Sequence, residues 1–355
     1  MNIKFRYCLV FMLITGLLLM SGCSQNLPTN GNGLNDLDDI VYRYSGSIGV
    51  GDFVMVEINL TAQTYKFENL ITGDTGSGDF QDYSNTFYAI TSGELSGNYF
   101  TFLADQILVV SVAEAEEGQR LIAALREIDS PYGDAIKGTY NLATSLEGWV
   151  GVVEIDTLNN QVDVKLDMDG DGDYDDEFEG EPEDLPLMDY TFNEDYKAIE
   201  IIEDEEFRHY GIFLNNDIGI FDSYVWDETA EDWTGDGMFV LVKQPDSVNL
   251  ADYAGEYTYI DVDASFGTFK LIEEGEGLKF IVDNEDTGII FEQENIEDGV
   301  IKFEADLLGD QEEPSEQTWY FIFLPGQVLV AASSHEEAFG GDLGGIAIGI
   351  CDKKL

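Results

Sequence analysis

The chain carries the same two-strand pattern three times, and this internal repetition limits the folds that it can adopt. Each copy consists of an apolar run that ends in leucine, a short turn and a second apolar run. The three leucines, Leu103, Leu214 and Leu324, are 111 and 110 residues apart. Self-similarity at a fixed spacing indicates one structural unit copied along the chain. The copies of this pattern cover residues 100–109, 211–220 and 321–330.

A second pattern precedes the first in every copy. It consists of two three-residue segments, each with a charged residue between two apolar residues, separated by a polar turn. Alternation with a period of two is typical of a strand that buries one face, so each pair of segments predicts an antiparallel hairpin. A tyrosine near the start of each unit, Tyr44, Tyr140 or Tyr257, is a third match. The paired segments are 56–58 with 65–67, 153–155 with 162–164, and 269–271 with 278–280.

These matches predict an all-β protein with three tandem antiparallel β-meander units, each a small barrel or a sandwich. Linkers that contain Pro and Ser place the units at residues 37–129, 130–246 and 247–355. Alternation alone leaves two points open. One is the choice between a barrel and a sandwich, and the other is whether the three units share one larger core.

For residues 114–128, the internal repeats and the local residue propensity predict different secondary structures. The segment is rich in Ala, Glu and Leu, which favour a helix. The corresponding positions in the other units, 238–242 and 346–348, read as strands. Because the units repeat, we expect a loop followed by a strand in the first unit as well.

The N-terminus has the order of an export signal. Lys4 and Arg6 precede an apolar stretch over residues 7–20, and Ser-Gly-Cys follows, ending at Cys23. The stretch is shorter than the roughly 18–20 residues of a transmembrane helix. The segment resembles the lipobox of bacterial lipoproteins. An ordinary secretory signal with an incidental cysteine is the alternative.

The lipobox resemblance implies cleavage before Cys23, lipid attachment to that cysteine and membrane anchoring of everything that follows. Residues 1–22 would be the signal peptide, and residues 23–36 would be a flexible tether. The protein would then lie in the bacterial cell envelope, outside the cytoplasm, at the outer membrane or the cell surface.

The sign of the charge excludes some partners. The chain has 16 Lys and Arg against 72 Asp and Glu, a formal net charge of −56. Such a field repels nucleic acid and anionic lipid headgroups, and it attracts divalent cations and basic proteins. A solvated acidic surface with no partner is the alternative. Hydrophobic residues make up 44% of the chain, which is enough for packed interiors.

An acidic segment in the middle unit has the spacing of a calcium loop. Carboxylates at alternate positions, with glycine allowing a sharp turn, can surround Ca²⁺ with oxygen ligands. The segment resembles the EF-hand and dockerin type of loop, and Phe178 stands where that pattern has a bidentate Glu. We expect weak Ca²⁺ binding in a hairpin loop, and one more solvated acidic loop is the alternative. The candidate ligands are Asp167, Asp169, Asp171, Asp173, Asp175 and Glu177.

Two tryptophans of the middle unit, Trp226 and Trp233, bracket a polar turn. Exposed tryptophans beside carboxylates can stack on sugar rings, which makes them candidate ligand-binding residues. Tryptophans that flank a turn are more often cross-strand partners that stabilise a hairpin, and we favour that interpretation.

These observations favour a non-catalytic exported lipoprotein whose three β units present a binding surface. No catalytic residues are assigned, because neither His209 nor His335 lies in a recognised nucleophile motif. The expected partners are the membrane, through the lipid, and a glycan or a basic protein. The alternatives are a glycan hydrolase that uses carboxylates and a purely structural component of the envelope.

Overall fold

The computed structural model describes most of the chain after residue 39. Within the described residues the regular structure consists of 25 strands and three short 3-10 turns, which confirms the all-β prediction. The turns are η1 (Gly133–Ile136), η2 (Leu250–Tyr253) and η3 (Gln293–Asn295). The described residues are 40–48, 52–84, 87–103, 106–112, 121–127, 133–145, 148–167, 187–202, 207–214, 216–227, 232–262, 264–305, 317–333 and 345–353.

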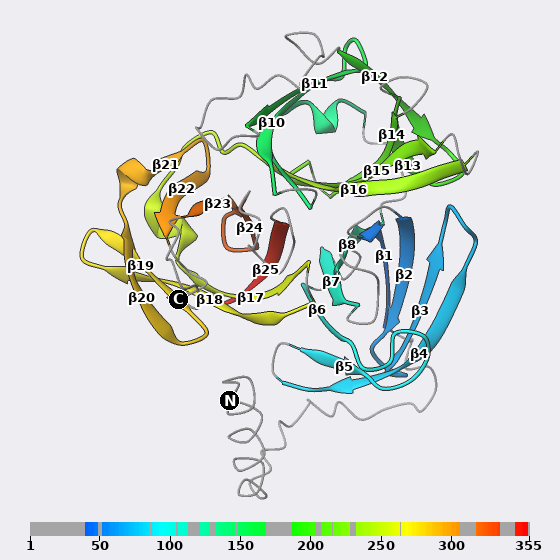
Figure 1. Cartoon of the computed structure of the whole chain (residues 1–355), viewed down its shortest axis with the longest axis horizontal. Helices are drawn as coiled ribbons and strands as arrows, with labels where there is room; N and C mark the ends of the chain where they lie inside the picture. The colour runs from blue at the N-terminus through cyan, green and yellow to red at the C-terminus, as the bar shows by residue number, and fades with distance from the viewer. Residues whose placement is uncertain are drawn as a thin grey trace, which may run out of the picture. The chain divides into compact units, whose positions relative to one another are not determined.

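The first unit is a closed antiparallel barrel of eight strands in sequence order (Figure 1). It closes because its first and last strands pair, from Tyr44 opposite Arg126 to Ile48 opposite Ile122. The strands are β1 (Val41–Ile48), β2 (Asp52–Asn59), β3 (Thr64–Asn69), β4 (Thr75–Asp82), β5 (Tyr88–Ile90), β6 (Tyr99–Leu103), β7 (Ile107–Ser111) and β8 (Leu121–Arg126).

The second unit is also a closed barrel of eight strands. Its last strand pairs with its first, from Phe239 opposite Thr144 to Lys243 opposite Tyr140. The strands are β9 (Gly138–Thr144), β10 (Val150–Asp156), β11 (Gln161–Asp167), β12 (Met188–Asn193), β13 (Ala198–Ile202), β14 (Phe207–Leu214), β15 (Ile218–Asp227) and β16 (Asp232–Lys243).

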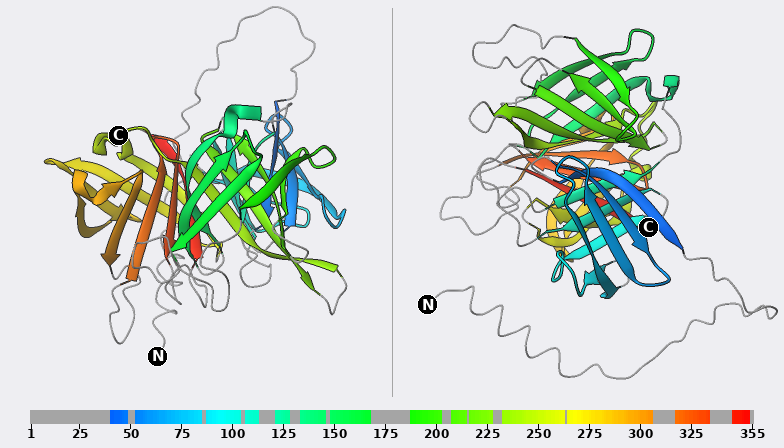
Figure 2. Two further views of the ribbon diagram at one scale, coloured as in Figure 1. Left: turned by 90° about the horizontal axis from the view of Figure 1, so that it is seen from above. Right: turned by 90° about the vertical axis from the view of Figure 1, so that its right-hand side faces the viewer.

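The third unit is a curled half-barrel, a nine-stranded sheet whose edges are β20 and the two-residue β21. Figure 2 shows its strands from the side. The strands are β17 (Gly255–Asp261), β18 (Phe266–Glu274), β19 (Gly277–Val282), β20 (Glu285–Phe291), β21 (Ile296–Glu297), β22 (Val300–Ala305), β23 (Gln317–Leu324), β24 (Val328–Ser333) and β25 (Gly345–Lys353).

The predicted hairpin around each repeated leucine has the same register in all three units. Leu103 pairs with Ile107, Leu214 with Ile218, and Leu324 with Val328. In each turn the leucine carbonyl accepts a 3.0 Å hydrogen bond, and the donors are the N–H groups of Gln106, Asp217 and Gln327. The carbonyl of each of these donor residues in turn accepts a bond from the last strand of its unit. Those bonds are Arg126 N to Gln106 O (2.7 Å), Lys243 N to Asp217 O (2.8 Å) and Cys351 N to Gln327 O (2.7 Å).

The other predicted hairpin differs in register in the third unit. Ile58 pairs with Tyr65 and Ile155 with Val162, which are seven residues apart in both cases. In the third unit the residue opposite Leu278 is Glu273 rather than Leu271. The strands there continue to a two-residue turn between Glu274 and Gly277, whereas the first two hairpins have four-residue turns. A shift of two residues leaves every side chain on its expected face.

Strand β8 confirms that repetition prevails over helix propensity in the first unit. All five residues from Leu121 to Leu125 are buried. Ile122 and Ala124 belong to the interior of the first barrel, while Leu121 and Leu125 belong to a cluster outside it. A strand buried on both faces accommodates an unbroken apolar run, so tertiary packing decides the conformation here.

The three units share one apolar cluster in addition to their own interiors. Each unit has an inner cluster, represented by Val56, Val153 and Phe280. The shared cluster takes side chains from the outer faces of all three units, such as Val109 and Val240. Burial of each such side chain stabilises the fold by about 1.5–3 kcal/mol. Residues 39–355 accordingly form one packed unit.

Candidate functional site

Most of the predicted site residues lie outside the described residues. These are the lipidation residue Cys23 and the loop residues Asp169, Asp171, Asp173, Asp175 and Glu177. Lipid attachment and calcium binding therefore stay predictions. The described part of the chain holds no cluster of three or more His, Cys, Asp or Glu side chains suited to a metal ion. Within the same residues, no helix has the length and apolar character needed to cross a membrane.

Asp167, the first position of the predicted calcium loop, is the last residue of β11. Its side chain is buried, and its Oδ2 accepts a 2.7 Å hydrogen bond from Tyr320 Oη of β23. The Tyr320 hydroxyl occupies one lone pair of this carboxyl oxygen. The contact therefore attaches the strand before the acidic loop to the third unit.

The two tryptophans of the middle unit meet across the β15–β16 hairpin. Trp226 lies directly opposite Trp233, with ring centroids 5.4 Å apart and an edge-to-face angle of 66°. The guanidinium of Arg208 lies 4.4 Å from the Trp233 ring centroid, within cation–π range. Both rings are half-buried, and each ring covers part of the other's surface. This geometry agrees with the cross-strand interpretation.

Further polar and aromatic side chains contact one another on β12, β13, β14 and the β12–β13 turn. Tyr210 Oη donates to Glu200 Oε1 at 3.2 Å, and Asn193 Nδ2 donates to Glu200 Oε2 at 3.0 Å. Tyr196 packs edge to face on Tyr210 at 5.3 Å. Burial raises the pKa of Tyr210, and the nearby Glu200 carboxylate raises it further. The sequence did not identify Arg208 and Tyr210 as candidate site residues, although their spacing of two along one strand places them on one face.

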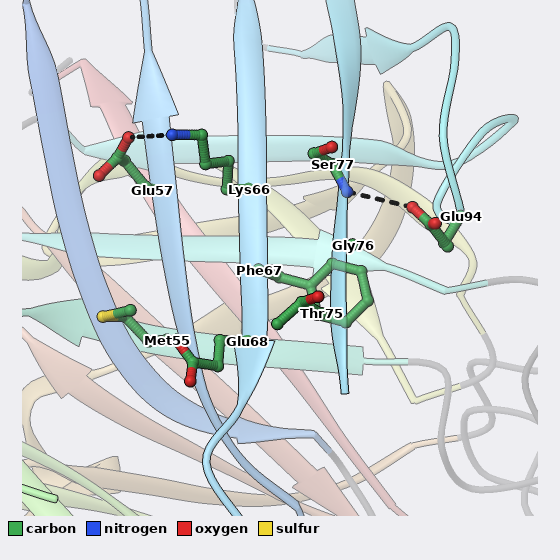
Figure 3. A pocket seen from close by; sticks show the side chains of 9 residues that line it. All are labelled: Met55, Glu57, Lys66, Phe67, Glu68, Thr75, Gly76, Ser77 and Glu94. Atoms are coloured by element: carbon green, nitrogen blue, oxygen red, sulfur yellow. Dashed lines mark hydrogen bonds and ion pairs between the residues drawn. The ribbon is translucent and has the colours of Figure 1, made fainter. Parts of the chain in front are cut away.

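A hollow of about 320 Å³ lies on the first barrel, along β2, β3 and β4 (Figure 3). Three carboxylates and one ammonium group contribute to its lining. We call this hollow the barrel-1 groove. Its lining residues are Met55, Glu57, Lys66, Phe67, Glu68, Thr75, Gly76, Ser77 and Glu94.

The charges of the barrel-1 groove are unevenly compensated. Glu57 forms ion pairs with Arg43 at 3.2 Å and with Lys66 at 3.6 Å. Glu94 Oε2 accepts a 3.1 Å hydrogen bond from the Ser77 backbone N–H (Figure 3). Glu68 has no ion-pair partner among the described residues. The groove therefore has carboxylate oxygens available for a cationic ligand.

The loop after β5 forms one wall of the groove because β4 is only partly paired on that side. Strand β5 pairs with β4 only from Phe80 to Asp82. Beyond that point, Asp79 N donates to Ser92 Oγ at 2.9 Å, next to the Ser77–Glu94 contact. Gly78 permits this close approach, since a Cβ there would lie 1.9 Å from the Ser92 carbonyl oxygen.

No known protein family matches the sequence, and no curated protein resembles it significantly. Among solved structures, a transferrin binding protein B double mutant from Haemophilus parasuis Hp5 has 11% identity and a TM-score of 0.26. The alignment covers 84% of this chain and 65% of that one. The isotype 1 transferrin binding protein B from serogroup B Neisseria meningitidis has 11% identity, coverages of 85% and 65%, and a TM-score of 0.25.

A Nostoc punctiforme protein of unknown function from the DUF3598 family also matches, with 10% identity and a TM-score of 0.20. That alignment covers 62% of this chain and 98% of the other. The chain spans about 65% of the length of the two transferrin binding proteins named above. The similarity is distant, and these values are too low to transfer a partner or a binding residue.

Proposed function

We propose that this chain is an exported, lipid-anchored binding protein that holds a basic segment of a partner protein in the barrel-1 groove. The groove carries the proposal, because three glutamates and one lysine line it on the surface of a very acidic chain. Charge complementarity of this kind gives specificity and a fast association rate.

The packing of the first barrel also supports binding at the surface. Large side chains such as Tyr44, Tyr65 and Phe100 are fully or almost fully buried within it. An eight-stranded barrel filled with side chains leaves little room for an internal ligand. The predicted lipid at Cys23 and the predicted calcium loop would then serve anchoring and local rigidity, while the groove would recognise the partner.

A short fluorescent peptide that alternates Lys with Ser tests the groove by anisotropy, with the intact chain as titrant. Replacement of Glu68 and Glu94 by Gln keeps an acceptor for Ser77 N–H while removing two charges. Exposed ion pairs contribute about 0.2–1 kcal/mol each, so the double variant should weaken binding by about two- to thirtyfold.

The matched control replaces Glu273 and Glu276, two exposed glutamates of the third unit, by Gln. This variant has the same net charge as the groove variant and should bind the peptide almost as well as the native chain. An equal loss in both variants would mean diffuse attraction to an acidic surface, and the groove would not be the site. A peptide that alternates Glu with Ser should not bind.

A further inference from the structure

A polar contact lies inside the apolar cluster that joins the first two barrels. Ser47 Oγ of β1 and Asp222 Oδ1 of β15 are 2.6 Å apart, and both residues are completely buried. Beside them, the Phe53 backbone N–H donates to Tyr224 Oη at 2.7 Å. These two hydrogen bonds connect the first two units through residues that are 175 and 171 positions apart in the sequence.

The burial and the polar contacts of Asp222 bear on its charge state. Ser47 Oγ also lies 3.1 Å from the carbonyl oxygen of Ile48, and a hydroxyl has one hydrogen to donate. One hydrogen cannot serve both contacts, and a proton on Asp222 would let the carboxyl donate in the 2.6 Å contact while Ser47 donates to Ile48. The buried Oδ2 of Asp222 has no hydrogen-bond partner. An unpartnered anionic oxygen is far more costly to bury than the carbonyl oxygen of a neutral acid.

Arg208 of β14 lies opposite Tyr224 and hydrogen-bonds to Tyr210, and no described ion pair joins it to Asp222. Asp222 pairs with Tyr210 of β14 and with Met238 of β16, and the ionisable groups acting on it are Tyr224 and Asp52 of β2. Strand β8 contributes apolar side chains to the same cluster. Burial raises the pKa of Asp222 well above its usual range, although hydrogen bonds with Ser47 and Tyr224 lower it in part. Burial also raises the pKa of Asp52, which Asn69 lowers in part.

We propose that Asp222 is held as a neutral carboxylic acid, and that its proton makes the contact between the first two barrels a pH-sensitive latch. The carboxyl donates to Ser47 Oγ, and Ser47 donates to the Ile48 carbonyl. Loss of the proton leaves in the apolar cluster an anion with no described ion-pair partner, close to the acidic Asp52. The β1–β15 contact then weakens.

The sign of the pH dependence follows from linkage. The folded chain binds the Asp222 proton more tightly than the unfolded chain does, so this group's contribution to stability is complete at low pH. It is lost as the pH rises through the pKa of the folded state. Above that pKa, each further pH unit should increase the open fraction of the contact between the first two barrels about tenfold.

Infrared spectroscopy of the intact native chain reads the proton directly. Near neutral pH, exposed carboxyls are ionised, so a neutral acid gives a separate carbonyl band. We expect this band in the native chain and its loss in Asp222→Asn. A native spectrum without the band near neutral pH, or with a band that persists in Asp222→Asn, would overturn the proposal. The native measurement holds even if the variant folds poorly.

Hydrogen exchange at the Phe53 amide measures how often the contact between the first two barrels opens. After correction for the intrinsic rate, exchange at Phe53 should accelerate about tenfold per pH unit above the transition in the native chain. In Asp222→Asn the amide side chain mimics the neutral acid, so exchange should be independent of pH. Asp52→Asn is the matched control and should keep the transition. Loss of the pH transition in Asp52→Asn, or its retention in Asp222→Asn, would contradict the proposal.

Discussion

Tyr320 of the third unit donates a 2.7 Å hydrogen bond to the buried carboxylate of Asp167 in the second. The contact spans 153 residues of sequence and lies next to the predicted calcium loop. It attaches that loop's first position to a packed interface rather than leaving it in solvent.

Replacement of Tyr320 by Phe should destabilise the chain by about 1–3 kcal/mol, because it removes a donor from a buried carboxylate. Urea unfolding measures the change. Tyr196→Phe is the control, since this half-buried hydroxyl has no hydrogen bond within the described residues. Equal stability of the two variants would show that the Tyr320–Asp167 bond contributes little.

Calcium titration of the purified chain should give a dissociation constant near 10⁻⁴–10⁻³ M, the range of extracellular modules. Replacement of Asp169 and Asp171 by Ala should abolish the heat of binding, because it removes two central carboxylates. Replacement by Ala of Asp283 in the β19–β20 turn and of Asp286 at the start of β20, the corresponding place in the third unit, should leave it unchanged. Titrations of the native chain without heat at millimolar calcium would rule out the site.

Gly148 and Gly275 allow packing to be separated from backbone strain. Their φ angles are +67° and +69°, but a Cβ on Gly148 would lie 1.9 Å from the Ser333 carbonyl oxygen, while Gly275 faces open space. Alanine at either position has the same strained backbone. Gly148→Ala should therefore be less stable than Gly275→Ala by about 1–3 kcal/mol, the usual effect of overpacking. Thermal and urea unfolding of both variants measure the difference, and equal losses would contradict the contact.

A double-mutant cycle on Trp226 and Trp233 should give a coupling of about 0.5–1.5 kcal/mol, as expected for an edge-to-face aromatic pair. Each alanine variant and the double variant are compared in urea. The neighbouring cross-strand pair, Val225 and Thr234, provides a control cycle in which no aromatic ring is removed. Additive losses at the tryptophans would mean that the rings do not stabilise each other.

Alternation and repetition predicted the strands, because both report which face of a strand is buried. They could not predict the register of the third hairpin, since 269–271 and 278–280 have the same spacing as the other copies. The difference arises in the two-residue turn between Glu274 and Gly277, a local choice of turn geometry.

The shared cluster had a sequence signal that alternation obscured. Residues 107–110 and 121–125 are unbroken apolar runs, which are typical of strands covered on both sides. Asp222 had a signal too, as the lone acid between Ile218 and Trp226 in an otherwise largely apolar strand. Neither pattern says which unit supplies the covering side chains, because that depends on contacts between distant segments. The barrel-1 groove depends on a similarly distant contact, between Ser77 and Glu94.

The shared apolar cluster also bears on how such a chain can be cut or rearranged. A single barrel produced alone would turn residues such as Val109, Leu121 and Leu125 toward water, on strands that are already fully paired. Such a fragment would aggregate or recruit another copy to replace its lost neighbours. Engineering of this protein by swapping or deleting individual barrels would therefore require a redesigned exterior, although each barrel has its own filled interior.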